Sequence, residues 1–72
     1  MPRVYFYKRL GERIVTERRK MGLSQEDLSY SSDIDRTYLA RIEEGKANPS
    51  IKVLKSLAYY LKKTVNELLE DV

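Results

Sequence analysis

Arg36, Thr37, Ala40 and Arg41 lie close together in the chain and have the chemistry to read DNA bases. Each of the two arginines can donate a pair of hydrogen bonds to the O6 and N7 atoms of guanine, which discriminates between bases by roughly 1–3 kcal/mol. Thr37 can contact a base edge, a thymine methyl group or a phosphate, and the small Ala40 would let a helix lie deep in the major groove. An ordinary solvated helix surface is the alternative for each residue taken singly.

Residues around this segment suit contacts with the DNA backbone, which orient a protein on the duplex. Gln25 stands at the start of a predicted helix, where free N–H groups and a side-chain amide can meet a phosphate. Tyr38, Lys46 and Asn48 are further candidates. A plain polar loop is the alternative for Lys46 and Asn48. Glu44 argues against a nearby phosphate, unless its carboxylate accepts from a cytosine amino group.

These side chains need a rigid support, and the sequence predicts a helix-turn-helix at about residues 25–44. Ser24 precedes the first of its two helices with an acid three residues on, a variant of the capping box. Asp35 can cap the second helix by accepting hydrogen bonds from its free N–H groups. Ser50 and Thr64 stand in the same position before two later helices. We expect the second helix of the pair to face outward.

The spacing of hydrophobic residues predicts a single all-α domain of five helices over residues 1–72. The predicted helices span residues 2–21, 25–31, 36–44, 51–61 and 65–70. Their inward-facing residues are Phe6, Leu10, Ile14 and Met21, then Leu28, then Leu39 and Ile42, then Ile51, Leu54, Leu57, Ala58 and Leu61. An extended arm at residues 4–7 is the alternative for the start of the first helix. Gly22 and Gly45 can end the first and third helices in a left-handed conformation.

Arg18 falls beside the apolar stripe of the first helix, where a guanidinium group is costly without a partner. The predicted partner is Glu43, near the end of the outward helix and on the flank next to Leu39. The alternative is that Arg18 extends its charged end to water. The pattern alone leaves both interpretations open.

The composition excludes several classes of protein. The 72 residues contain no cysteine and no histidine, which removes disulfides, the usual metal ligands and the commonest catalytic base. No nucleophile–base pair and no Gly-rich phosphate loop is present, so we expect no enzyme, no metal, no cofactor and no small-molecule ligand. No apolar run reaches the roughly 18 residues that span a bilayer, and no signal peptide is evident, so a cytoplasmic protein is expected. The net charge of +3 permits a nucleic-acid partner.

One copy of such a domain would read too few base pairs for high specificity, so we expect a homodimer on a palindrome of double-stranded DNA. The fifth helix has more apolar surface than its own packing needs, and the predicted interface is Tyr59, Val65, Leu68 and Leu69. The alternatives are that Leu68 belongs to the core and that Tyr59 is simply exposed. We favour a mixture, with Leu68 mostly in the core.

Two other functions compete with sequence-specific regulation. An antitoxin would bind a protein partner through the fifth helix, with DNA binding secondary. A non-specific nucleic-acid binder would lose affinity with salt but ignore sequence. Activation of transcription would also need a surface that touches RNA polymerase, for which Glu26 and Glu44 are candidates by their expected exposure.

Three stretches resemble the Cro/lambda-repressor-like helix-turn-helix family, also called the XRE family. They are GLSQEDL at residues 22–28, DRTYLARIEEGKANPS at 35–50, and SIKVLKSLAYYL with TVNELL after it. The resemblance covers about residues 8–70. It implies a five-helix DNA-binding domain, bound as a symmetric dimer to a palindromic operator, that regulates transcription. It further implies that Gln25 contacts DNA, that Arg36, Thr37 and Arg41 face bases, and that Arg18 and Glu43 form an internal ion pair.

The sequence departs from the family pattern at two positions. Ser29 stands where the family usually has alanine, and Asp33 where it usually has a turn glycine. Serine still fits between helices, and aspartate tolerates a left-handed backbone better than most residues. The run at residues 35–38, on a chain without a sensor domain, is similar to controller proteins of restriction–modification systems, which are autoregulating dimers. Related repressors and antitoxins share these residues.

Overall fold

The computed structural model describes residues 3–72, with side chains from Tyr5 onward. The helices are α1 (Arg3–Lys20), α2 (Gln25–Ser32), α3 (Arg36–Glu43), α4 (Ile51–Tyr60) and α5 (Val65–Leu69). No strand occurs in residues 3–72, so the predicted all-α fold of five helices is confirmed. Residue 2, the predicted start of the first helix, lies outside the described residues. The extended-arm alternative is wrong, because the backbone from Tyr5 to Tyr7 is helical.

Helices α2 to α5 each begin with a side chain that accepts a hydrogen bond from a free N–H of the first turn. These caps are Ser24, Asp35, Ser50 and Thr64. At α2 and α5 a second hydrogen bond completes a capping box, because Asp27 and Glu67 accept from the backbone N–H of the cap residue. That backbone hydrogen bond, made by Ser24 to Asp27 and by Thr64 to Glu67, lowers the pKa of each carboxyl group below its ordinary value.

The first four helices end in the same way, with a left-handed residue that stops the chain sharply. These residues are Gly22, Asp33, Gly45 and Lys62, with φ angles of 70°, 56°, 76° and 58°. The N–H that follows each one donates to a carbonyl five residues back, as from Lys46 to Arg41 at 2.8 Å. Glycine adopts this conformation without steric cost, whereas Asp33 and Lys62 carry backbone strain. These sharp endings let the chain turn back, so that successive helices pack around one core.

The core consists of hydrophobic side chains from all five helices and the turn between α2 and α3. Its buried members are Leu10, Ile14, Leu28, Ile34, Leu39, Ile42, Leu54, Leu57, Ala58, Leu61 and Leu68. Two predicted core residues are instead exposed, Met21 and Ile51. Met21 follows the last residue of α1, so the helical spacing no longer places it inward. Ile51 opens α4 and is 60% exposed, because the buried face of this helix begins only at Leu54.

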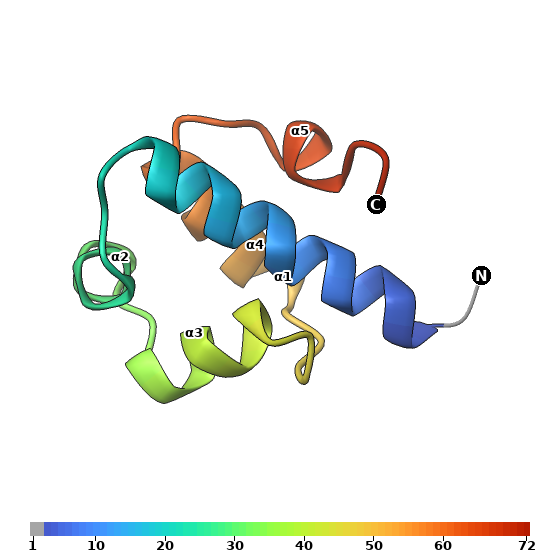
Figure 1. Ribbon diagram of the computed structural model, residues 1–72. Coiled ribbons are helices and arrows are strands. Elements are labelled where there is room, and N and C mark those ends of the chain that lie inside the picture. Colours follow the sequence, from blue (N-terminus) through green and yellow to red (C-terminus); the bar gives the residue numbers. More distant parts are fainter. Residues whose placement is uncertain (1–2) are drawn as a thin grey trace.

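Helix α1 runs through the middle of the domain, with α3 on one side and α5 on the other (Figure 1). The contact with α3 is close because Gly11 has no side chain. A Cβ atom there would lie 2.5 Å from the backbone carbonyl oxygens of Ile42 and Glu43. The end of α3 therefore rests directly on the backbone of α1, and Gly11 fixes the separation of the two helices.

Candidate nucleic-acid interface

Helix α3 presents a polar face to solvent and buries the opposite one. Leu39, Ile42 and Glu43 are buried, which anchors the helix along its length. Arg36, Thr37 and Arg41 are exposed, and Ala40 and Tyr38 are half-buried at the edges of the exposed face. The four predicted base-reading residues thus lie on or beside one face of one helix. Tyr38 also packs against the core, so only part of its side chain is accessible for the predicted contact with the DNA backbone.

Two cations on or beside this face, Arg36 and Lys46, already have acidic neighbours. The Arg36 guanidinium lies 3.5 Å from the Glu26 carboxylate, and the Lys46 ammonium lies 3.9 Å from Glu44. All four side chains are well exposed, and exposed pairs of this kind contribute only about 0–1 kcal/mol. A phosphate or a guanine could therefore replace either acid at small cost.

Arg41 is held by the loop that follows α3. Its Nη2 atom donates a hydrogen bond to the carbonyl oxygen of Lys46 at 3.0 Å, and the Lys46 N–H donates to the Arg41 carbonyl at 2.8 Å. The same loop carries Asn48, which is exposed. The side chain predicted to read a base thus also holds in place the segment predicted to contact phosphates. The remaining N–H groups of the guanidinium stay available to a ligand.

Beneath this face, Arg18 and Glu43 form a buried ion pair between α1 and α3. The guanidinium meets the carboxylate with two hydrogen bonds, Nε to Oε2 at 2.8 Å and Nη2 to Oε1 at 2.9 Å. Its Nη1 atom donates to the carbonyl of Leu23 in the loop before α2 at 3.0 Å. Because the charges neutralise one another and the polar atoms have partners, the pair tolerates burial that either residue alone would not.

Gln25 joins the same carboxylate from the start of α2. Its amide nitrogen donates to Oε1 of Glu43 at 2.9 Å, so the side chain is directed inward and is half-buried. The sequence predicted that this amide faces a phosphate, and it gave no signal of the internal bond to Glu43. The amide has a second N–H and a carbonyl oxygen that this bond does not use. Glu43 therefore links three elements at once: α1, α2 and α3.

The residues predicted for a dimer interface differ in how much surface they offer. Tyr59 is 75% exposed, and Val65 and Leu69 are half-buried at the surface of α5. Leu68 is 0% exposed, so the prediction that it lies mostly in the core is confirmed, and in the single chain it offers no surface to a partner. Because α5 packs against both α1 and α4, the one side chain at its centre is enclosed within the chain and has no area left for a partner.

Helices α2 and α3 are two capped helices in succession, and the second one faces outward. Residues 14–68 match the family model described as "Helix-turn-helix". The chain belongs to the helix-turn-helix family of XRE type. The fold is that of lambda-repressor-like domains, and the family consists of sequence-specific DNA-binding transcription regulators.

Several helix-turn-helix proteins are similar to this chain. The transcriptional regulator DdrOP3 of Deinococcus deserti is 39% identical over 64 residues, which is 89% of this chain and 50% of that protein, so the chain spans about half its length. Control protein C.MunI from a Mycoplasma species is 42% identical over 53 residues, 74% of this chain and 72% of that protein. The crystal structure of the restriction-modification controller protein C.AhdI from Aeromonas hydrophila superposes with a TM-score of 0.84 at 35% identity, over 86% of this chain and 94% of that one.

Within the described part of the chain, no group of acidic residues is arranged to hold a metal ion. None of the described helices has both the length and the apolar character that crossing a membrane requires. The relatives reported above are transcription regulators or control proteins, and none is an enzyme.

Loss of the Glu43 carboxylate should strongly destabilise the domain. The change Glu43→Ala leaves the Arg18 charge buried without a partner, and we expect a loss of about 3–5 kcal/mol in the free energy of unfolding. Urea denaturation followed by circular dichroism measures it. The adjacent Glu44→Ala is the matched control and should change stability by no more than about 0.5 kcal/mol, because its side chain is exposed.

The double variant Arg18→Met, Glu43→Leu removes both charges and should recover most of the lost stability, because a well-packed apolar pair can replace a buried ion pair. A cost for Glu43→Ala as small as that of the Glu44→Ala control would show that the pair does not support α3.

Proposed function

We propose that this chain is a sequence-specific regulator of transcription that binds a palindromic operator as a symmetric dimer, and that it autoregulates a restriction–modification operon. The observation that carries the proposal is the outward face of α3, with Arg36, Thr37 and Arg41 exposed on a helix whose other side is anchored by Leu39, Ile42 and the ion pair. An α-helix with short and forked side chains on its free face fits the major groove.

The backbone contacts in this proposal surround α3. Gln25 at the start of α2, Tyr38 on α3, and Lys46 and Asn48 in the next loop are the proposed phosphate contacts. Phosphate contacts fix the position of the protein on the duplex, and base contacts then select the sequence. The Arg41–Lys46 hydrogen bond supports this division, because it couples the base-reading helix to the loop proposed to contact the backbone.

Dimer formation is proposed through α4 and α5. Tyr59 on α4 and Val65 and Leu69 on α5 leave apolar surface exposed or half-exposed. Helix α5 lies on the far side of α1 from α3 (Figure 1). A two-fold dimer places its recognition helices about 34 Å apart, which is one turn of DNA, so each can enter a successive major groove on one face. The operon is proposed from the similarity to C.MunI and C.AhdI, whose names describe a control protein and a restriction-modification controller.

Selection of bound duplexes from a random-sequence pool tests the function directly. We expect the parent protein to enrich a palindrome whose half-sites are about 10 base pairs apart, because the dimer axis must coincide with that of the site. A pool that binds but shows no enriched sequence would instead indicate non-specific association driven by phosphate charge.

Changes at Arg41 should alter which sequences are bound. With the enriched duplex, Arg41→Ala should lose roughly 1–3 kcal/mol, because alanine has no donor for guanine. Arg41→Lys should lose part of this, because its ammonium group lacks the planar fork of arginine. On random duplex Arg41→Lys should bind like the parent, since it keeps the charge. Fluorescence anisotropy titrations on both duplexes measure the ratio of the affinity for the enriched duplex to that for the random duplex.

Gln25→Ala is the comparison variant for this experiment and should weaken both duplexes by a similar factor, as expected for a backbone contact. Equal losses on enriched and random DNA for both Arg41 variants would remove Arg41 from base reading.

Leu69→Asp should weaken the dimer and, through it, operator binding. A carboxylate placed in an apolar interface must be desolvated without a partner, so we expect the dimer dissociation constant to rise at least tenfold. Sedimentation equilibrium at micromolar concentration measures this constant. Asn66→Asp, which adds the same charge at an exposed position of α5, is the control. A parent protein that is monomeric at micromolar concentration would contradict the interface.

A further inference from the structure

Beyond the capping box at its start, helix α5 has few means of its own to hold its position. It comprises five residues, with Leu68 as its single fully buried side chain. Its last turn contains no basic residue, and Glu70 and Asp71 follow directly. The C-terminal end of a helix has unpaired carbonyl groups and a partial negative charge, which nearby acids make worse. This end of α5 therefore needs a cation from elsewhere in the chain.

Arg13 of α1 supplies that cation. Its Nη1 atom donates to the carbonyl oxygen of Glu67 at 2.7 Å, and its Nη2 atom donates to that of Glu70 at 2.8 Å. Both bonds are short for a nitrogen donor and join residues more than fifty positions apart in the chain. The planar fork of a guanidinium suits two neighbouring acceptors. A lysine has a single ammonium group and cannot donate to both acceptors in this geometry.

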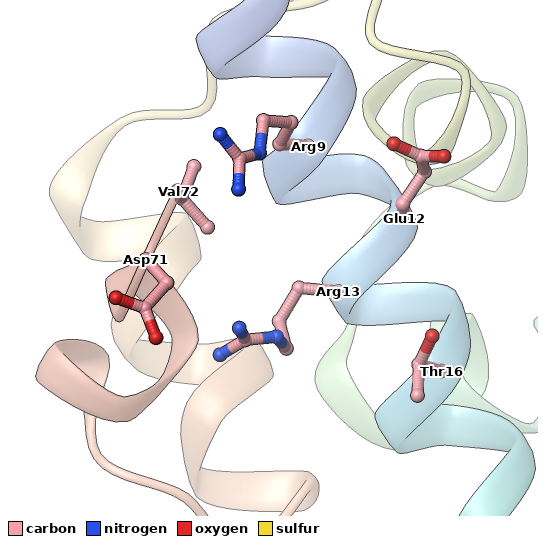
Figure 2. Close-up of a pocket in the computed structure, with 6 residues that line it drawn as sticks. All are labelled: Arg9, Glu12, Arg13, Thr16, Asp71 and Val72. Carbon is pink, nitrogen blue, oxygen red and sulfur yellow. The ribbon is translucent and has the colours of Figure 1, made fainter.

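Arg9 lies one helical turn before Arg13 and provides a contrast. Both arginines line a shallow hollow of about 260 Å³ between α1 and the segment after α5, together with Glu12, Thr16, Asp71 and Val72 (Figure 2). Figure 2 shows both side chains directed from α1 toward that segment. Among the described residues, however, only Arg13 of the two makes side-chain hydrogen bonds. Arg9 and Arg13 thus both lie near Asp71, but only Arg13 makes the forked contact with the carbonyl groups.

We propose that Arg13 is the positioning residue that sets the dimerisation surface on α5. This inference rests on the proposed function, because Val65 and Leu69 of that surface belong to α5. Arg13 acts through the helix: by capping its C-terminal carbonyl groups it fixes where those two side chains lie relative to α1. Its loss should loosen α5 and weaken the dimer while leaving the helix-turn-helix intact.

The experiment compares Arg13→Met, Arg13→Lys and Arg9→Met in the full chain. Methionine keeps the apolar stem and removes the donors, and Arg9→Met loses the same charge from the same hollow. Amide hydrogen exchange reports on the local order of α5, and sedimentation equilibrium gives the dimer dissociation constant. For Arg13→Met we expect on the order of tenfold faster exchange in α5 and a dissociation constant raised on the order of tenfold, with α2 and α3 unchanged.

Arg13→Lys should fall between Arg13→Met and the parent, and Arg9→Met should stay within about twofold of the parent in both measurements, since its charge is exposed and screened. If the parent is a dimer and the dissociation constant of Arg13→Met is no higher than that of Arg9→Met, the inference is overturned, while the proposed dimer still holds. Faster exchange throughout the chain in both Arg13 variants would also overturn it, because the residue would then support the whole fold. A monomeric parent would remove the dimer itself from the proposed function, and this inference with it.

Discussion

The carboxylate of Glu43 is the constraint on which the outward face of α3 depends. It accepts two hydrogen bonds from Arg18 and one from Gln25, so a single buried group joins α1, α2 and the end of α3. Arg18 extends the connection to the loop before α2 through the Leu23 carbonyl. Apolar packing alone would let α3 slide or rotate on the core. A charged group with fixed directions of acceptance allows only one arrangement, and this gives the outward face of α3 a defined orientation.

The shortness of the helices is the second constraint. Helices α2 and α3 have eight residues each, and isolated helices of that length are not stable in water. Their stability comes from caps at the start, left-handed residues at the end, and contact with the core. Gly11 adds to this by allowing the backbones of α1 and α3 to touch, which brings Leu39 and Ile42 fully into the core. Local chemistry at the helix ends and tertiary packing are therefore both required.

The helix positions could be predicted from the sequence because their signals are local. Cap residues and hydrophobic spacing placed each predicted end inside the described range within one residue of the observed one. The left-handed residue Lys62 could not be predicted, because lysine is unusual there and only the chain direction after α4 requires it. Ile51 followed the helical spacing and is exposed all the same, because spacing does not show where along a helix its neighbours begin.

The polar contacts between distant parts of the chain were harder to predict. An arginine beside the core needs a partner, so the pattern offered Glu43 for Arg18, although it left open that Arg18 extends to water. Gln25 and Arg13 make no such demand, since a surface amide or guanidinium is satisfied by water. Their partners, Glu43 and the carbonyl groups of α5, emerge only when the helices are packed together. Part of the positive charge of α1 is therefore used within the domain, because Arg13 binds carbonyl groups beside the acidic residues Glu70 and Asp71.

Arg13 and Arg18 stand five residues apart on α1, which at 100° per residue places them about 140° apart around the helix axis. One side chain holds α5 and the other holds α3, so polar links from a single straight helix reach the proposed dimer surface and the proposed DNA surface. A dimer that reads two half-sites must keep its recognition helices at a fixed separation of about 34 Å. Any tilt of α5 against α1 would be carried to both copies of α3. In the proposed dimer, the two arginine links of α1 therefore connect the dimer surface to the recognition helix, as a fixed spacing between half-sites requires.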